Sequence, residues 1–465
     1  MYSLATALTI ALTVGIDGAL GHKGCGGHEV MRRNPGGPVV HNIEELRNLE
    51  NAARNGGWIR RQVTDEASAA QSTDPSTECT AYSYAPVTNM KSSFPTIWQT
   101  ATLVAGDTEA ASLFATINAT VNSEVPNIKP KGNGHAGDFS NSGYTAADPD
   151  CWWTWKQCTK GDPGNGINAD FTTVPEANTW GLGFDDGPNC SHNAFYDYLR
   201  DNGQKATMFY IGSNVMDWPL QAQRGLADGH HICVHTWSHQ YMTSFSNEEA
   251  FAELYYTRKA IKEVLGVTPT CWRPPFGDVD NRIRLIAQGL NMTNYVWSDD
   301  SEDWRAGATG SNVTQADVTA NYQSVVSGVA NGSYASHGPM VLTHELTNFT
   351  MSEFVSQYPS IKAAFKYVVP LASAFNITQP YVETNYTYPD FLTYTNQSSG
   401  SSASTSASGS SASSGSASAS GSSASSKASS GSTSNTAKSS AVSTMASGGI
   451  VGGLVSVLAG ALLLL

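Results

Sequence analysis

The sequence predicts an α/β fold, a distorted or incomplete (β/α) barrel of about seven parallel strands. Two observations favour it. Between about residues 178 and 375, short apolar runs alternate with amphipathic stretches of helical length, which is typical of parallel strands joined by crossover helices. This segment of about two hundred residues is shorter than a complete barrel usually is, and an open doubly wound sheet is the alternative.

The expected strands are short apolar runs bounded by turn residues. They lie at residues 180–184, 206–211, 231–234, 270–272, 295–297, 340–343 and 367–369. The expected helices lie between them, at residues 193–202, 215–228, 247–265, 280–288, 315–329 and 351–367. Residues 62–159 form an N-terminal flanking region. Its part up to residue 150 is polar and has no chemical motif, so the sequence assigns that part no function.

Chemically active side chains follow the expected strands at the points where they end. The stretches that carry them are "FDDGP" with Asp185 and Asp186, "HTWSH" with His235 and His239, "RPPFG" with Arg273, "DSEDW" with Asp303 and Trp304, and "LTH" with His344. Active sites of parallel α/β folds lie at the carboxyl ends of the strands. These five strand ends are therefore expected to converge on one site.

His235 and His239 are four residues apart, so one helical turn would point both imidazoles to the same side, as a divalent metal requires. One carboxylate of the Asp185–Asp186 pair completes a His₂Asp set with open positions. Such a set suits zinc, with cobalt, nickel or iron as alternatives. The other aspartate is left to act as a general base, and His344 can act as a general acid toward a departing amine.

Taken together and in this order, the five motifs resemble those of the NodB-like polysaccharide deacetylases, carbohydrate esterase family four, over roughly residues 160–380. With its two termini, the chain is similar to the fungal chitin deacetylases of that family. The resemblance implies a NodB homology domain. Two positions depart from the family pattern, Gly183 in place of Thr and Glu345 in place of Asp, and neither removes a ligand or the acid–base pair.

The resemblance implies a role for each motif residue. Asp185 is the general base tuned by Arg273, and His344 is the general acid tuned by Asp303. The metal, zinc or cobalt, is held by three residues, Asp186, His235 and His239. The pocket for the acetyl methyl group is lined by Trp304 and Leu342, and a backbone N–H near Phe276 assists the oxyanion.

The implied reaction is metal-dependent hydrolysis of the N-acetyl groups of N-acetylglucosamine units in chitin, which gives chitosan and acetate. One alternative keeps the site and changes the substrate to another acetylated glycan such as acetylxylan. Another is a non-catalytic wall-binding protein, and the complete acid, base and ligand set opposes it. Trp152, Trp153 and Trp155 either form a platform for sugar rings or pack around a loop between Cys151 and Cys158.

Both termini indicate a secreted, membrane-anchored protein. Residues 1–21 are typical of a signal peptide, and residues 398–440 form a Ser/Ala/Gly-rich stalk. Residues 441–465 resemble a glycosylphosphatidylinositol (GPI) attachment signal with a hydrophobic tail, and Asn435 is the preferred attachment site. A tail-anchored membrane protein is the alternative. The expected location is the plasma membrane or the cell wall.

Other features of the composition fit this reading. The net charge of −13 with only 26 Lys and Arg residues excludes a typical nucleic-acid-binding protein.

Of seven cysteines, Cys25 would be lost with a propeptide over residues 22–61, cleaved at Arg60–Arg61. The remaining six allow fifteen pairings, of which Cys151–Cys158 is favoured. Nine glycosylation sequons lie at Asn118, Asn189, Asn291, Asn312, Asn331, Asn348, Asn376, Asn385 and Asn396.

Overall fold

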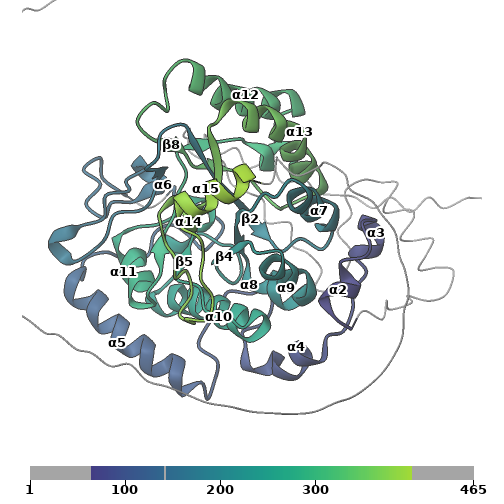
Figure 1. Ribbon diagram of the computed structural model, residues 1–465. Coiled ribbons are helices and arrows are strands. Elements are labelled where there is room, and N and C mark those ends of the chain that lie inside the picture. Colours follow the sequence, from purple (N-terminus) through teal and green to yellow (C-terminus); the bar gives the residue numbers. More distant parts are fainter. Residues whose placement is uncertain (1–63, 141–142, 401–465) are drawn as a thin grey trace, which may run out of the picture. The chain divides into compact units, whose positions relative to one another are not determined.

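The structure, a computed structural model, describes residues 64–140 and 143–400 (Figure 1). Its main sheet has six strands in the order β10-β2-β3-β4-β5-β6, and all neighbouring strands are parallel. Their bounds are Thr179–Gly187 for β2, Thr207–Tyr210 for β3, His231–Val234 for β4, Cys271–Trp272 for β5, Thr293–Asn294 for β6 and Tyr367–Pro370 for β10.

A second ladder lies beside β2. In it, β7 (Asp299–Asp300) pairs in parallel with β9 (Val341–Leu342), and single bridges join Met340 to Gly181 and His344 to Asp185. A short antiparallel pair, β1 (Thr173–Val174) with β8 (Gly338–Pro339), adds to this side. The expectation of a distorted or incomplete barrel is confirmed, with β2 contacting both the main sheet and the segment that contains β9.

Helices surround the sheet (Figure 1). Their bounds are Asn193–Asp201 for α7, Gly212–Asp217 for α8, Pro219–Ala227 for α9, Asn247–Leu265 for α10, Asn281–Gly289 for α11, Gln315–Ala330 for α12, Asn348–Ala364 for α13, Leu371–Ala374 for α14 and Phe391–Gly400 for α15. The helix expected at residues 215–228 is two helices, because Pro219 cannot continue α8 and instead starts α9. The helix expected to reach residue 367 ends at Ala364, because Tyr367 already belongs to β10.

The N-terminal flank packs against the outer helices. It contains α2 (Glu66–Ala69), α3 (Pro75–Glu78), α4 (Ala85–Met90), α5 (Thr108–Glu124) and α6 (Trp153–Lys156). Figure 1 shows α5 next to α11 and α10, and residue contacts join these elements. Tyr82 donates a hydrogen bond to Gln221 (2.7 Å), and Trp98 donates one to Asp217 (2.8 Å).

Glu253 of α10 joins the flank to the loop after β4. This fully buried carboxylate accepts hydrogen bonds from the backbone N–H groups of Ala101, Trp237 and Ser238, each at 2.8 Å. Burial raises the pKa of Glu253, and the three donors compensate part of that cost. The loop that carries His235 and His239 is thus fixed from the outer face of the barrel.

Three disulfides bind the described residues together: Cys79–Cys190, Cys151–Cys158 and Cys233–Cys271. The favoured pairing of Cys151 with Cys158 is confirmed, and Cys79–Cys190 links the flank to the loop after β2. The signal peptide, the propeptide with Cys25, the stalk from residue 401 on and the GPI signal with Asn435 lie outside the described residues. No helix within residues 64–140 or 143–400 is long and apolar enough to cross a bilayer.

Candidate active site

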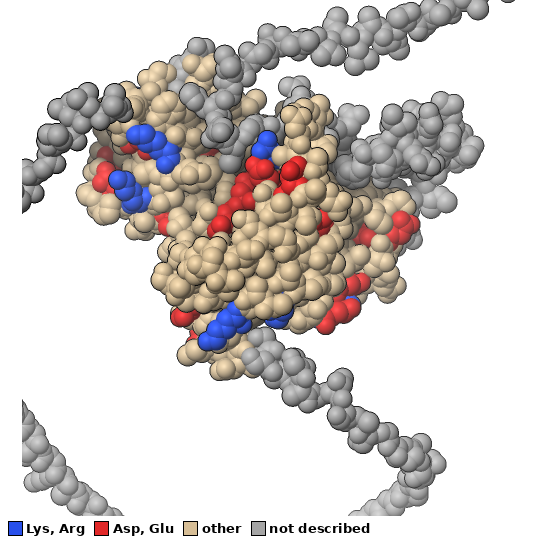
Figure 2. Space-filling model, turned by 90° about the horizontal axis from the view of Figure 1, so that it is seen from above, with Lys and Arg blue, Asp and Glu red and all other residues tan. Residues whose placement is uncertain are grey.

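A pocket lies where the strands of the barrel end. It is lined by Asp185, His235, His239, Phe276, Trp297, Trp304, Leu342 and His344. All of these except Trp297 are predicted site residues. They lie at the ends of β2 and β9 or in the segments that follow β4, β5, β6, β7 and β9. On the face drawn in Figure 2, the described Lys and Arg side chains are scattered.

The three predicted metal ligands converge at this pocket. Oδ1 of Asp186 lies 3.4 Å from Nε2 of His235 and 3.0 Å from Nε2 of His239. Nδ1 of His235 donates a hydrogen bond to the carbonyl oxygen of Arg273 (2.8 Å), so its Nε2 lone pair faces Asp186. One ligand atom from each residue lies within 4.8 Å of the others. This donor set fits a divalent cation with positions left open.

The two histidines do not reach this geometry through a helical turn, as the spacing predicts. Residues 235–239 form a bent loop after β4, in which Thr236 (φ 63°) and His239 (φ 53°) have left-handed backbone conformations. Asp186 (φ 71°) and Phe276 (φ 59°) share this conformation. Such residues are uncommon outside glycine and gather at functional sites, where the surrounding fold holds them in place.

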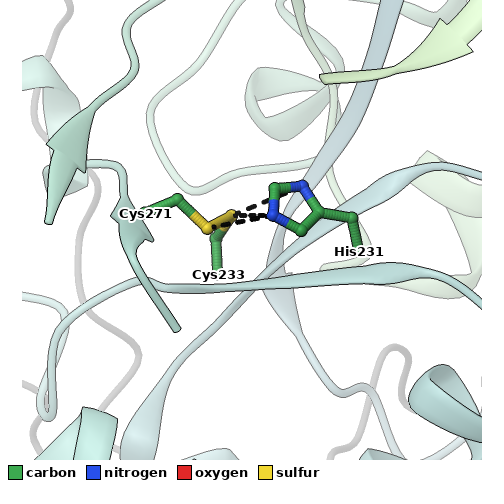
Figure 3. Close-up of side chains that lie close together, drawn as sticks. All are labelled: His231, Cys233 and Cys271. Atoms are coloured by element: carbon green, nitrogen blue, oxygen red, sulfur yellow. Dashed lines mark hydrogen bonds between the residues drawn. A yellow bond between two sulfur atoms is a disulfide. The ribbon is translucent and has the colours of Figure 1, made fainter. Parts of the chain in front are cut away.

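Burial alone would raise the pKa of Asp186, but the neighbouring His239 and His235 outweigh it and hold that pKa well below its ordinary value. The carboxylate is therefore ionised, as a metal ligand must be. A second cluster of possible donors contains His231, Cys233 and Cys271 (Figure 3). Its two sulfurs form a disulfide and supply no thiolate, so this cluster does not fit a metal.

Asp185, the predicted base, pairs with Arg273. Nη1 of Arg273 donates to Oδ1 of Asp185 at 2.7 Å, and both side chains are almost completely buried. The guanidinium lies 4.2 Å from the centre of the Phe209 ring, which fixes its position from the other side. Oδ2 of Asp185 lies 3.9 Å from Nε2 of His235, so the base stands beside the predicted metal ligands.

His344, the predicted acid, pairs with Asp303. Its Nδ1 donates to Oδ1 of Asp303 at 2.6 Å, and its backbone N–H donates to the other carboxylate oxygen at 3.0 Å. Burial lowers the pKa of His344, but the negative charge of Asp303 outweighs it and raises the pKa to about 9. The imidazole is therefore protonated at neutral pH, as a general acid must be.

Two residues with roles at the site are not identified by the motifs. Trp297 forms part of the pocket wall, and its only sequence signal is an aromatic residue close before "DSEDW". Glu345 accepts hydrogen bonds from Asn189 N–H (2.8 Å), His192 (2.7 Å) and Tyr196 (2.8 Å), so it fixes the turn after Asp185 and Asp186. The position where the family often has Asp thus carries a structural carboxylate.

The described sequons differ in accessibility. Those at Asn291, Asn312, Asn331, Asn348, Asn376, Asn385 and Asn396 are exposed. Asn118 and Asn189 are half-buried, and the side-chain amide of Asn189 donates to the carbonyl oxygen of Leu346 (2.7 Å). Asn189 is therefore the least suited of the nine to carry a glycan.

Comparisons with known proteins agree with this geometry. Residues 173–295 match the family model described as polysaccharide deacetylase. The chain is 59% identical over 403 residues to chitin deacetylase 2 of Cryptococcus neoformans var. grubii, covering 87% of this chain and 83% of that protein. It is 46% identical to chitin deacetylase of Amylomyces rouxii, covering 71% of this chain and 78% of that protein.

Among solved structures, the chitin deacetylase of Colletotrichum lindemuthianum is similar at 19% identity with a TM-score of 0.42, covering 46% of this chain and 96% of that one.

The arrangement of donors predicts which substitutions abolish metal binding. His235→Ala removes one of the three predicted ligands, so it should weaken the binding of a divalent metal at least about a hundredfold. Asp185→Asn leaves the three ligands in place and should keep the metal. Equilibrium dialysis followed by elemental analysis measures both. His337→Ala, in a half-exposed histidine outside the pocket, is the control. Metal binding by His235→Ala at the wild-type affinity would contradict the assignment.

Proposed function

Because the chain belongs to the polysaccharide deacetylase family, we propose that it hydrolyses the N-acetyl groups of N-acetylglucosamine units in chitin, giving chitosan and acetate. One observation of the geometry carries the proposal. Asp185 and His344 line the same pocket, and their buried partners have opposite charges, Arg273 for the first and Asp303 for the second. An amide hydrolase needs such a base and acid together.

In this proposal, Asp186, His235 and His239 hold a divalent cation, zinc or cobalt. When bound, the cation polarises the amide carbonyl and lowers the pKa of water. The remaining steps belong to the side chains of the pocket. Asp185, held in position by its hydrogen bond from Arg273, accepts the proton of the attacking water.

His344 then donates the proton on its Nε2 to the departing amine nitrogen. Its Nδ1 stays bound to Asp303, so the ring keeps its orientation during the transfer. Trp304 and Leu342, which are almost completely buried in the pocket wall, receive the acetyl methyl group. In this proposal a backbone N–H near Phe276, which lines the same pocket, assists the oxyanion.

Chitin is favoured over acetylxylan because the similar curated proteins that span most of this chain are chitin deacetylases. The alternative of a non-catalytic wall-binding protein is opposed by the completeness of the site. Base, acid, their two partners and the three ligand residues all lie within or directly behind one pocket.

Acetate release by the purified protein tests the proposed reaction. N-acetylglucosamine oligomers and acetylated xylan are assayed side by side, untreated, after chelation and after zinc or cobalt is restored. We expect release from the amino-sugar oligomers that chelation abolishes and the metal restores. Asp185→Asn should lower kcat by at least about a thousandfold, because the proton of the attacking water has no acceptor. Release from xylan alone, or near-normal activity of Asp185→Asn, would contradict the proposal.

The pair of His344 and Asp303 predicts a change in pH dependence. The wild-type acid loses its proton as the pH rises through its pKa of about 9, so kcat should fall in that range. In Asp303→Asn, the lowering effect of burial on the pKa of His344 is no longer outweighed. The alkaline limb of the kcat–pH profile should therefore shift to lower pH by about one unit or more. Asp299→Asn, in a half-buried aspartate of the neighbouring β7, is the control. An unmoved alkaline limb in Asp303→Asn would show that His344 is not the acid.

We also propose that the chain is secreted, glycosylated and held at the plasma membrane or the cell wall by a GPI anchor attached at Asn435. Its sequence supports this through the polar stalk followed by a terminal apolar tail. Phosphatidylinositol-specific phospholipase C should release the protein from cells, and deletion of residues 441–465 should send it to the medium. A deletion variant that remains in the membrane fraction would exclude the anchor.

A further inference from the structure

The N-terminal flank reaches the wall of the catalytic pocket through α6. The ring of Trp153 lies 4.8 Å, centre to centre, from the ring of Trp297, which lines the pocket. The Trp153 ring also packs against Gly277. A Cβ atom added at Gly277 would lie 2.5 Å from a carbon of that ring. Gly277 directly follows Phe276, another pocket residue. The side chain of Trp153, which belongs to the flank, therefore lies directly behind the pocket wall.

Aromatic rings lead outward from the pocket to this flank. Phe276 stacks on Tyr241 with ring centres 4.0 Å apart, and the edge of Phe139 meets Tyr241 at 5.3 Å. Phe139 in turn meets Trp152 at 4.8 Å, and Trp152 stacks on Trp155 at 6.2 Å with an interplanar angle of 8°. Trp152 is 1% exposed, whereas Trp155 is 39% exposed.

The packing decides between the two predictions made for Trp152, Trp153 and Trp155, which are a platform for sugar rings and packing around the Cys151–Cys158 loop. Trp152 and Trp153 are buried and pack around the Cys151–Cys158 loop, so they cannot form a platform. Trp155 keeps much of its indole at the surface while Trp152 and Tyr144 hold the ring in place. The axial C–H groups of a β-linked sugar ring form an apolar face that can stack on such an indole.

The segment that carries Trp155 is fixed to the barrel. Asp278, in the loop after β5, accepts hydrogen bonds from the Trp152 indole (2.7 Å) and the Thr243 N–H (2.7 Å). Lys131 is buried and pairs with Asp280 (2.5 Å) and Asp150 (3.0 Å). A surface held in place before binding loses little conformational entropy when a ligand arrives.

Other exposed large apolar side chains of the described residues lie elsewhere. They are Val382, Tyr386 and Leu392. Their segment contacts the amino ends of strands, because Tyr381 accepts a hydrogen bond from Ile232 N–H near the start of β4 and Phe391 packs on Tyr367 at the start of β10. Trp155 is thus the member of this group that ring contacts connect to the pocket wall.

We propose that Trp155 forms a binding position for a sugar unit of the chitin chain that lies outside the catalytic pocket. The inference rests on the proposed deacetylation of chitin and adds to it a contact that only longer chains can make. The rings of Trp152, Phe139, Tyr241 and Phe276 connect Trp155 to the pocket wall through the protein, and this connection favours the polysaccharide as the occupant. The flank then contributes to substrate recognition as well as to stability.

The test compares the full-length wild-type protein with Trp155→Ala on the N-acetylglucosamine dimer and hexamer. We expect KM for the hexamer to rise about three- to tenfold, with kcat and the kinetics on the dimer unchanged. Trp155→Phe should restore most of the loss. Tyr386→Ala, which removes an aromatic residue of similar exposure (37%) at the other end of the strands, should change nothing. Thermal unfolding checks that each variant is folded.

An equal KM for the hexamer in wild type and Trp155→Ala, or an equal rise for both oligomers, would overturn the inference. If the wild type releases no acetate from either oligomer, the proposed function fails and calorimetric titration with the hexamer decides the rest. Weaker hexamer binding by Trp155→Ala than by the wild type would then support a sugar site independent of deacetylation. Equal binding, or none by the wild type, would contradict it.

Discussion

The site depends on one backbone pairing, between the end of β2 and the segment that follows β9. Asp185 N–H donates to the carbonyl oxygen of Thr343 (2.9 Å), and Glu345 N–H donates to the carbonyl oxygen of Asp185 (2.8 Å). In parallel pairing, such hydrogen bonds fix the register, that is, which residues of the two strands lie side by side. The pairing therefore brings Asp185 next to His344, residues that are 159 positions apart in the sequence. The remaining parts of the site are arranged around this junction.

The two sides of the junction have buried partners of opposite charge, Arg273 beside Asp185 and Asp303 beside His344. A buried imidazole on its own would tend to be neutral, because burial penalises the charged form. For His344, the negative charge of Asp303 reverses this tendency and raises the pKa to about 9. Left-handed conformations at Asp186, His239 and Phe276 cost on the order of 1–3 kcal/mol each. The buried core of the barrel and the disulfides hold the chain in these conformations.

The sequence predicts the members of the site well because chain direction alone places the ends of parallel strands together. It also predicts α10 to the residue, since Ser246 and Glu249 form a capping box and Gly266 ends the helix. It fails where geometry depends on contacts between distant segments. The His235–His239 loop is held by Glu253 of α10, and the expected strand at residues 295–297 lies earlier, at Thr293–Asn294. No local pattern contains this information.

The flank illustrates the same limit for function. The family model covers residues 173–295, but Asp303 and His344 lie beyond it, and on its other side Trp153 supports the wall formed by Trp297. Lys131 contacts Asp280, and Ala101 contacts Glu253, across more than a hundred residues in each case. Because these partners are buried, the flank and the barrel share one set of stabilising contacts with the loops of the site. The polar composition of the flank gives no prediction of its function. In the structure, its few buried charges and aromatic rings contact the loops that carry the site.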